Sequence, residues 1–300
     1  MRELFDRRHV RRAFSRAAMS YDAAARLQRD VQEHLLESLD YLEQRVPQVV
    51  LDIGSGPGHA ATAMQRRWPK AHVLALDLAL PMLAASRQRG RWHPLRRRVQ
   101  PVCADARALP LAEGSVDVLF SNLCLQWIED LPAVFAGFRR VLRPGGLLLV
   151  STFGPDTLQE LRAAFSEAEH SDANPVPHVS PFAGIAQFGD ALMAAGFRDP
   201  VLDRDLTVTR YPDLAALMRE LRAIGATNAL QARRHTLTGK ARFARAAAAY
   251  AILAGEGLPL PATWETITAM AWSPAAGAPI REAGVEIARF PASGIPVRRR

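Results

Sequence analysis

The stretch Val49-Val50-Leu51-Asp52-Ile53-Gly54-Ser55-Gly56-Pro57-Gly58 decides the fold that the sequence predicts. Its first half is a short apolar run, which is typical of a strand buried on both faces of a parallel sheet. Its second half is rich in glycine, which lets the backbone turn sharply and lets a ligand approach the main chain closely. We therefore expect a strand, a ligand-binding turn and the start of a helix.

Strand-like and helix-like segments alternate beyond this turn, as in a parallel sheet that carries helices on both faces. The expected strands are residues 49–54, 72–78, 99–104, 116–123 and 146–152, and the expected helices between them are 60–68, 81–89 and 131–142. Farther along, helices are expected at 157–169, 185–195, 214–224 and 239–253, and strands at 201–209 and 264–271. Residues 174–181 are expected to form a loop over the carboxyl edge of the sheet.

Two acids flank the glycine turn and indicate which ligand it holds. Asp52 lies just before the first glycine, where a carboxylate would oppose a pyrophosphate but suits a cation such as an amino-acid ammonium group. Asp77 ends the next strand, about 20 residues after the turn, where an acid is placed to accept both ribose hydroxyls of an adenosine. An adenosine with a cationic amino-acid arm and no phosphate describes S-adenosylmethionine.

Two further strand ends converge on the same crevice. Asp105 is placed to accept the adenine amino group and Ala106 to donate a backbone N–H, while Asn122 and Leu123 would face the methionine arm. Each residue also has a structural interpretation when taken alone, since Asp77 can cap a helix and Asp105 can stabilise a turn. The full set of candidate cofactor-binding residues is Gln28, Asp52, Gly54, Gly56, Gly58, Asp77, Leu78, Asp105, Ala106, Asn122 and Leu123.

The overall charge suggests an acidic partner. The formal net charge is +8, and every basic residue except Lys70 and Lys240 is arginine. Nucleic acid, an anionic membrane and an acidic protein all fit such a charge. Two cysteines favour a reduced cytoplasm over a disulfide scaffold, and no apolar run is long enough for a membrane span or a secretion signal, so neither is expected.

The motifs resemble those of class I S-adenosylmethionine-dependent methyltransferases, whose Rossmann-like fold has a seven-stranded, mostly parallel sheet with an antiparallel last strand. The matching segments are residues 52–58, 76–78, 104–106, 109–110, 116–118 and 142–146. This α/β resemblance implies one compact domain with four segments. They are an N-terminal helical lid (1–46), an S-adenosylmethionine-binding half (47–154), a substrate-side half with inserted helices (155–275) and a C-terminal tail (276–300) with little sequence pattern, expected to be partly disordered.

The flanking segments narrow the resemblance to malonyl-acyl-carrier-protein O-methyltransferases of biotin synthesis. They are residues 13–22, 27–28, 121–127 and 218–227. The resemblance implies transfer of a methyl group to the free carboxylate of a malonyl thioester, which gives the ester that primes pimeloyl synthesis. An acidic acyl carrier protein is the implied partner, with coenzyme A left open as the thioester carrier. Residues 153–162 and 178–182 are also similar to a mitochondrial complex I assembly factor that hydroxylates an arginine, which is the alternative function.

Methyl transfer to a carboxylate asks little of side-chain chemistry, because the acceptor is already ionised at neutral pH. Catalysis should come from alignment in a dry site, with an anchor for the carboxylate and no metal. Tyr21, Arg162 and His178 are the candidates, although each also has an ordinary role as a packing or solvated residue. Residues 87–98 carry six arginines and are the candidate face for the acidic carrier, or else a solvated loop. A nucleic-acid substrate and a membrane are not expected, since Trp92 is the only aromatic residue in this cluster.

Overall fold

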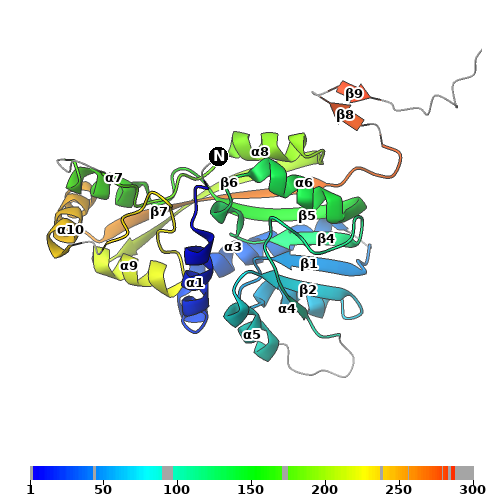
Figure 1. Ribbon diagram of the computed structural model, residues 1–300, viewed down its shortest axis with the longest axis horizontal. Helices are drawn as coiled ribbons and strands as arrows, with labels where there is room; N and C mark the ends of the chain where they lie inside the picture. The colour runs from blue at the N-terminus through cyan, green and yellow to red at the C-terminus, as the bar shows by residue number, and fades with distance from the viewer. Residues whose placement is uncertain are drawn as a thin grey trace, which may run out of the picture.

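A computed structural model describes residues 3–42, 45–89, 97–170, 175–236, 239–255, 257–278, 280–282 and 285–287. Its centre is a seven-stranded sheet in the order β3-β2-β1-β4-β5-β7-β6 (Figure 1). The strands are β1 (Val49–Ile53), β2 (His72–Asp77), β3 (Gln100–Cys103), β4 (Val116–Ser121), β5 (Leu142–Phe153), β6 (Arg198–Tyr211) and β7 (Leu260–Trp272). The first five pair in parallel, while β7 runs antiparallel between β5 and β6. The predicted sheet is confirmed.

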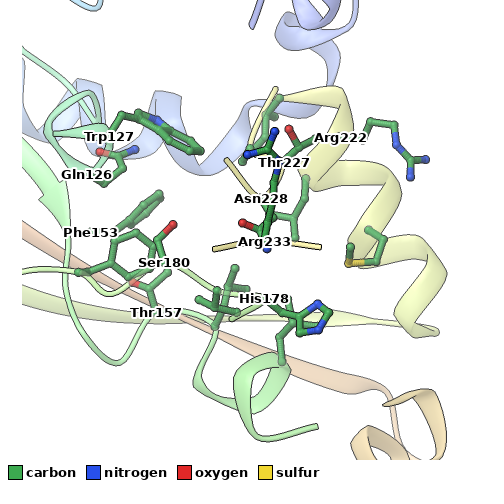
Figure 2. A pocket seen from close by; sticks show the side chains of 18 of the residues that line it. Gln126, Trp127, Phe153, Thr157, His178, Ser180, Arg222, Thr227, Asn228 and Arg233 are labelled. Carbon is green, nitrogen blue, oxygen red and sulfur yellow. The ribbon is translucent and has the colours of Figure 1, made fainter. Parts of the chain in front are cut away.

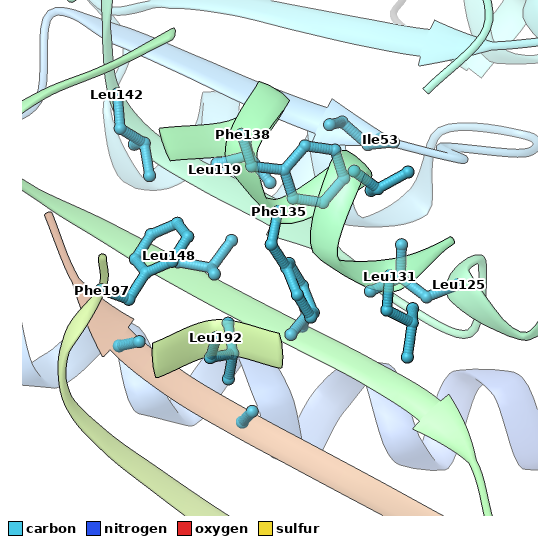
Figure 3. Close-up of a cluster of buried hydrophobic side chains, with 14 of the residues drawn as sticks. Ile53, Leu119, Leu125, Leu131, Phe135, Phe138, Leu142, Leu148, Leu192 and Phe197 are labelled. Atoms are coloured by element: carbon cyan, nitrogen blue, oxygen red, sulfur yellow. The ribbon is translucent and has the colours of Figure 1, made fainter. Parts of the chain in front are cut away.

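Alternating residues of the central strands build a core on each face of the sheet. In β1, Val50 packs with a cluster on one face that includes residues of helices α3 (Arg26–Glu37), α4 (His59–Arg67) and α5 (Leu80–Arg89). Leu51 packs with a cluster on the other face that includes residues of α6 (Leu131–Val141) and α8 (Ile185–Ala194). Figure 3 shows the second cluster around Phe135 of α6. The ring of Phe135 meets that of Phe188 in α8 edge-on, with 5.1 Å between the ring centroids. Burial on both faces holds the sheet between two helical layers and fixes the positions of its strand ends.

Ten α-helices are present in the described part of the chain, together with two short 3-10 helices. They are α1 (Arg7–Ala17), α2 (Tyr21–Ala24), α3 (Arg26–Glu37), α4 (His59–Arg67), α5 (Leu80–Arg89), α6 (Leu131–Val141), α7 (Gln159–Ala168), α8 (Ile185–Ala194), α9 (Leu214–Ala223), α10 (Lys240–Ala254), η1 (Ser38–Leu42) and η2 (Leu125–Trp127). None of these helices is both long and apolar enough to cross a membrane. Figure 1 shows α7, α9 and α10 gathered at one end of the long strands β6 and β7, with α1 between them and the rest of the sheet.

The N-terminal segment, expected to be helical over residues 1–46, is divided into α1, α2, α3 and η1. A turn at residues 18–20 separates α1 from α2, and Ala25, in a non-helical conformation, separates α2 from α3. Asp6 caps α1 by accepting the backbone N–H of His9 at 3.0 Å. The breaks let the segment bend over the carboxyl edge of the sheet.

The C-terminal segment also differs from the prediction. β8 (Ile280–Glu282) and β9 (Val285–Ile287) form a two-stranded antiparallel sheet, where a tail with little pattern is expected. The predicted loop at 174–181 is neither helix nor strand from residue 175 onward, and residue 174 lies outside the described residues. The division of the chain into four segments stays a prediction.

Candidate functional site

The glycine turn follows β1 and leads into α4. Gly54 and Gly58 have φ angles of +67° and +80°, and a Cβ at Gly54 would lie 2.5 Å from Sγ of Cys124. A Cβ at Gly58 would collide with Ser86 of α5, whereas one at Gly56 would meet nothing within 4 Å. Gly54 and Gly56 line the cavities beside the turn, but Gly58 lines none of them. Gly58 therefore lets α4 pack closely against Ser86 of α5, and its contact with the cofactor stays a prediction.

Asp77 organises the turn from the neighbouring strand. Its Oδ2 accepts the backbone N–H of Gly56 at 2.9 Å, and its Oδ1 accepts that of Ala79 at 2.7 Å. Burial raises the pKa of the Asp77 carboxyl, although these hydrogen bonds act against the rise. Asp77 and Leu78 line a hollow that we call the glycine-turn cavity, together with residues from three other strand ends.

Asp52 lies beneath the turn and is only 2% exposed. Its Oδ2 accepts the backbone N–H of Ala61 in α4 at 3.0 Å. Burial raises the pKa of the Asp52 carboxyl to about 7, and nearby Asp77 adds to the rise. Asp52 lines a second, smaller hollow, the Asp52 cavity, which Gln28 of α3 also lines. A buried carboxylate that is costly to ionise suits a cationic ligand, which would offset that cost.

Asp105 and Ala106 line the glycine-turn cavity from the end of β3, as the sequence predicts for a ligand-binding position. Both oxygens of Asp105 are engaged by Arg107, with Nε–Oδ1 at 2.9 Å and Nη2–Oδ2 at 2.7 Å. Burial opposes ionisation, but the hydrogen bonds from Arg107 hold the pKa of Asp105 below its ordinary value. Its carboxylate is therefore fixed and charged, and recognition of adenine by Asp105 stays a prediction.

Asn122 and Leu123 connect the end of β4 to the N-terminal helices. The Asn122 Nδ2 donates to the backbone oxygen of Gln28 at 2.9 Å, and Ser151 donates to its Oδ1 at 2.8 Å. Leu123 has a φ angle of +46°, and its N–H donates to the Ser151 hydroxyl at 2.9 Å. These bonds fasten α3 over the sheet edge and complete the wall that the glycine-turn and Asp52 cavities share.

A third and larger hollow, the main cavity, lies on the other side of this wall and has a volume of about 540 Å³. Figure 2 shows its aromatic and polar side chains facing one another, among them Trp127, Phe153 and Ser180. Phe14, Leu123 and Trp127 line both the main cavity and the glycine-turn cavity. Tyr21 lines all three hollows. The junction of the hollows is therefore an aromatic gate with Tyr21 at its centre.

Tyr21 is a neutral phenol in this gate. Burial raises its pKa well above the ordinary value, and the nearby carboxylate of Asp77 raises it further. A neutral phenol is able to donate a hydrogen bond to an anion without repelling it. The predicted placement of Tyr21 beside the ligand cavity agrees with its position, while its catalytic role stays a prediction.

His178 also lines the main cavity, on the loop that follows α7. Its ring stacks on Phe165 at 4.0 Å between centroids, and its Nε2 lies 3.0 Å from Oε1 of Glu169. Glu169 is 1% exposed and also contacts Arg242 at 3.0 Å. Although burial works against it, hydrogen bonds from Val176 and His178 hold the pKa of Glu169 below its ordinary value. A buried, ionised Glu169 therefore orients the histidine toward the cavity.

Arg162 is not among the residues that line the main cavity. Its Nη2 instead donates to the backbone oxygens of Pro155 at 3.1 Å and Thr157 at 3.3 Å. The reason is helical periodicity, since α7 turns Leu161 and Phe165 toward the cavity and leaves Arg162 on the adjacent side. Arg162 therefore lies outside the lining of the main cavity, and its role as a carboxylate anchor stays a prediction.

Polar residues that the sequence does not single out complete the main cavity. Thr157, Asn228 and Arg233 line it, and Arg233 is held by Asp6 at 2.8 Å. Asn228 donates to the backbone oxygen of Pro177 at 2.7 Å and so ties its segment to the His178 loop. These residues come from separate segments of the chain, and no local motif marks them.

The predicted carrier-docking face at residues 87–98 is described only in part, because residues 90–96 lie outside the described residues. Arg89 is engaged in the structure. Its Nε donates to the backbone oxygen of Pro57 at 3.0 Å, and its guanidinium forms an ion pair with Asp22 of α2. Asp22 also lies 2.9 Å from Nε2 of His59. Arg89 therefore fastens the N-terminal helices to the glycine turn.

Comparison with known proteins agrees with this geometry. Residues 51–150 match a family described as a methyltransferase domain. A malonyl-[acyl-carrier protein] O-methyltransferase of Xylella fastidiosa is 60% identical over 301 residues, covering 100% of this chain and 99% of the relative. The chain belongs to this family. A relative of the same description from Gallionella capsiferriformans is 43% identical over 275 residues, which are 91% of this chain and 92% of the relative. The predicted resemblance is confirmed.

Solved structures support the fold. The YcgJ protein of Bacillus subtilis has a TM-score of 0.57 at 15% identity and covers 80% of this chain and 97% of its own. A phosphoethanolamine N-methyltransferase of Haemonchus contortus in complex with S-adenosylhomocysteine has a TM-score of 0.51 at 20% identity, with 81% of this chain and 52% of its own covered. The methyltransferase fold that the sequence predicts is therefore confirmed.

The donor set at the two smaller hollows fits S-adenosylmethionine. Asp77 and the glycine turn line one hollow and suit a ribose, while the buried Asp52 lines the next and suits an ammonium group. Gly56 leaves open space in which the ligand can approach the main chain. In the described part of the chain, we find no group of three His, Cys, Asp or Glu residues that is able to hold a metal ion.

Proposed function

We propose that this protein transfers a methyl group from S-adenosylmethionine to the free carboxylate of a malonyl thioester borne by an acidic acyl carrier protein. The product would be the methyl ester that primes pimeloyl synthesis for biotin. One structural observation carries the proposal, namely the gate at Tyr21 where the hollow suited to the methyl donor opens into a second hollow large enough for a thioester arm. The relatives reported above carry the corresponding description.

The methyl donor supplies an electrophilic methyl group bound to a positively charged sulfur. The protein has to hold the donor by its two ends, which we assign to Asp77 at the ribose and Asp52 at the ammonium group. The malonyl carboxylate is ionised near neutral pH and needs no base. The remaining tasks are to bring its oxygen into line with the methyl group and to keep water out.

The aromatic gate performs both tasks in this proposal. The rings of Phe14 and Trp127 meet edge-on, with their centroids 5.5 Å apart, and line both hollows at the junction. The neutral hydroxyl of Tyr21 would donate to the carboxylate as it reaches the gate. His178, held by Glu169, would contact the malonyl group from the loop side. The two free cysteines, Cys103 and Cys124, support a reduced cytoplasm as the proposed compartment.

The test is mass spectrometry of malonyl carrier protein after incubation with the purified protein and S-adenosylmethionine. We expect the carrier protein to gain the mass of one CH2, the net change when a carboxyl hydrogen is replaced by a methyl group, and we expect this gain to leave together with the malonyl group when the thioester is cleaved. Unloaded carrier protein is the matched control and should gain nothing. If no methyl group is added while S-adenosylmethionine still binds, the proposed function is wrong. No feature of the described residues specifically favours the alternative, an arginine hydroxylase.

A further inference from the structure

A fourth hollow lies beside the main cavity, between α1 and α9. We call it the arginine groove and define it by His9, Arg12, Arg16, Arg219, Arg222 and Thr227. Its volume is about 590 Å³. His9, Arg222 and Thr227 also line the main cavity, so the two hollows adjoin. If a thioester arm enters the main cavity over these shared residues, the protein that bears the arm would lie in the groove.

The groove is strongly cationic. Arg12 and Arg16 are four residues apart on α1, and Arg219 and Arg222 are three apart on α9, so each pair shares one side of its helix. All four side chains are exposed. Within the described part of the chain, none of the four guanidinium groups has an ion pair or hydrogen-bond partner. The groove-lining residues in that part include no acid.

The two helices that carry the groove arginines are fixed to each other by direct contacts. The Ser20 hydroxyl donates to the backbone oxygen of Ala223 at 2.8 Å, which joins the end of α1 to the end of α9. A Cβ at Gly225 would lie 2.9 Å from the Phe14 ring, so the two segments are in close contact. The pKa of His9 reflects the local field, because burial lowers it and the positive charges of Arg233, Arg16 and Arg12 lower it further.

We propose that the arginine groove is the docking surface for the acidic carrier protein and that the thioester arm passes from it over Arg222 and Thr227 into the main cavity. The inference rests on the proposed function and names where its partner binds. Guanidinium groups bind carboxylates and phosphodiesters with two parallel hydrogen bonds, so acidic side chains and the phosphodiester at the root of the arm are complementary to the groove. Arg89, in contrast, is engaged in holding the N-terminal helices.

The experiment compares two variants of equal charge. The groove variant is Arg12→Gln/Arg16→Gln/Arg219→Gln, whose three positions line the groove but not the main cavity. The control variant is Arg66→Gln/Lys70→Gln/Arg210→Gln, at exposed positions outside α1 and α9 that line none of the four hollows. Binding of fluorescently labelled malonyl carrier protein is measured by anisotropy across a salt series. Methylation of malonyl-N-acetylcysteamine, a thioester without carrier or phosphate, is measured in parallel.

We expect the groove variant to bind the carrier protein about tenfold or more weakly, with a flatter salt dependence, while the control variant binds like the original chain. Both variants should methylate the small thioester at the original rate, which also shows that they are folded. The proposal is overturned if carrier binding is unchanged in the groove variant, or if both variants lose carrier binding equally. It is also overturned if RNA displaces the labelled carrier at a lower concentration than unlabelled carrier protein does. Absence of any methyl ester contradicts the proposed function, and the binding comparison still decides the docking surface.

Discussion

Protonation of Asp52 should control the affinity of the protein for S-adenosylmethionine. The carboxyl is 2% exposed, and burial raises its pKa to about 7. The ligand's ammonium group favours the ionised carboxylate, so affinity should rise as the pH increases toward and through 7. With a pKa of about 7, roughly 3% of the free protein is ionised at pH 5.5 and roughly three quarters at pH 7.5. The association constant should therefore increase about 25-fold over this range.

The assay is titration calorimetry with S-adenosylhomocysteine, which keeps the amino-acid arm and is chemically stable, at pH values between 5.5 and 7.5. The matched ligand is methylthioadenosine, which has the same adenosine but lacks the ammonium group. Its affinity should change little, and a change shared by both ligands would instead report Asp77, whose pKa burial also raises. The matched variant is Asp52→Asn, which should bind S-adenosylhomocysteine about 10- to 100-fold more weakly at pH 7.5 and without the pH dependence.

The same variant tests the cause of the pKa shift. Because the pKa of Asp52 is raised from 3.8 to about 7 on folding, ionisation of this carboxyl lowers the free energy of unfolding. This loss of stability is absent below pH 3.8, grows as the pH rises, and is complete above about pH 7. Asp52→Asn should therefore increase the free energy of unfolding at pH 8, by at most about 4 kcal/mol, and change it little at pH 4. If the affinity for S-adenosylhomocysteine does not change with pH, or if Asp52→Asn destabilises the protein at pH 8, Asp52 is not a buried acid that binds the ammonium group of the ligand.

Four further substitutions test other parts of the site. Gly58→Ala should lower the free energy of unfolding in urea by about 2–4 kcal/mol, because it combines a positive φ with a collision against Ser86. Gly56→Ala has open space around the new Cβ and should lower it by only about 1–2 kcal/mol, so equal losses would contradict this assignment. Tyr21→Phe should lower kcat for malonyl carrier protein about 10- to 100-fold with unchanged donor affinity, and an unchanged kcat would remove its hydroxyl from the mechanism. Glu169→Gln should raise KM for the malonyl thioester about tenfold with little change in kcat, and an effect on donor affinity instead would contradict a role in positioning His178.

The convergence of the candidate cofactor residues at one edge of the sheet could be predicted because its signals are local. Asp52, Asp77 and Asn122 each follow or end an apolar strand, and parallel pairing brings those strand ends to one edge. The role of Gly58 could not be predicted, because it depends on contact with Ser86 of α5, which only the packed structure shows. The breaks in the N-terminal helix also escaped prediction, since the apolar spacing continues across them while tertiary bonds such as Ser20 to Ala223 decide where the chain bends.

The main cavity could not be derived from local patterns, because its lining comes from segments that are distant in the sequence. His9, Trp127, His178 and Arg233 meet only after the lid, the sheet edge and the helices beyond β5 have packed together. Arg162 shows the limit most clearly, because a shift of one position along α7 separates a cavity-lining residue from one that binds backbone carbonyls.

The chemistry explains why the two halves differ in this way. The donor has fixed polar groups at fixed separations, so its site needs particular acids at particular strand ends, and these leave a pattern in the sequence. The acceptor needs only to be aligned and kept dry, so many side chains are able to form its wall and none is required to act as a base. Specificity for a carrier-borne malonyl group must then come from the route into the cavity. The adjoining arginine groove supplies such a route, because it selects by charge outside the cavity and leaves the gate at Tyr21 to align the one carboxylate that reaches it.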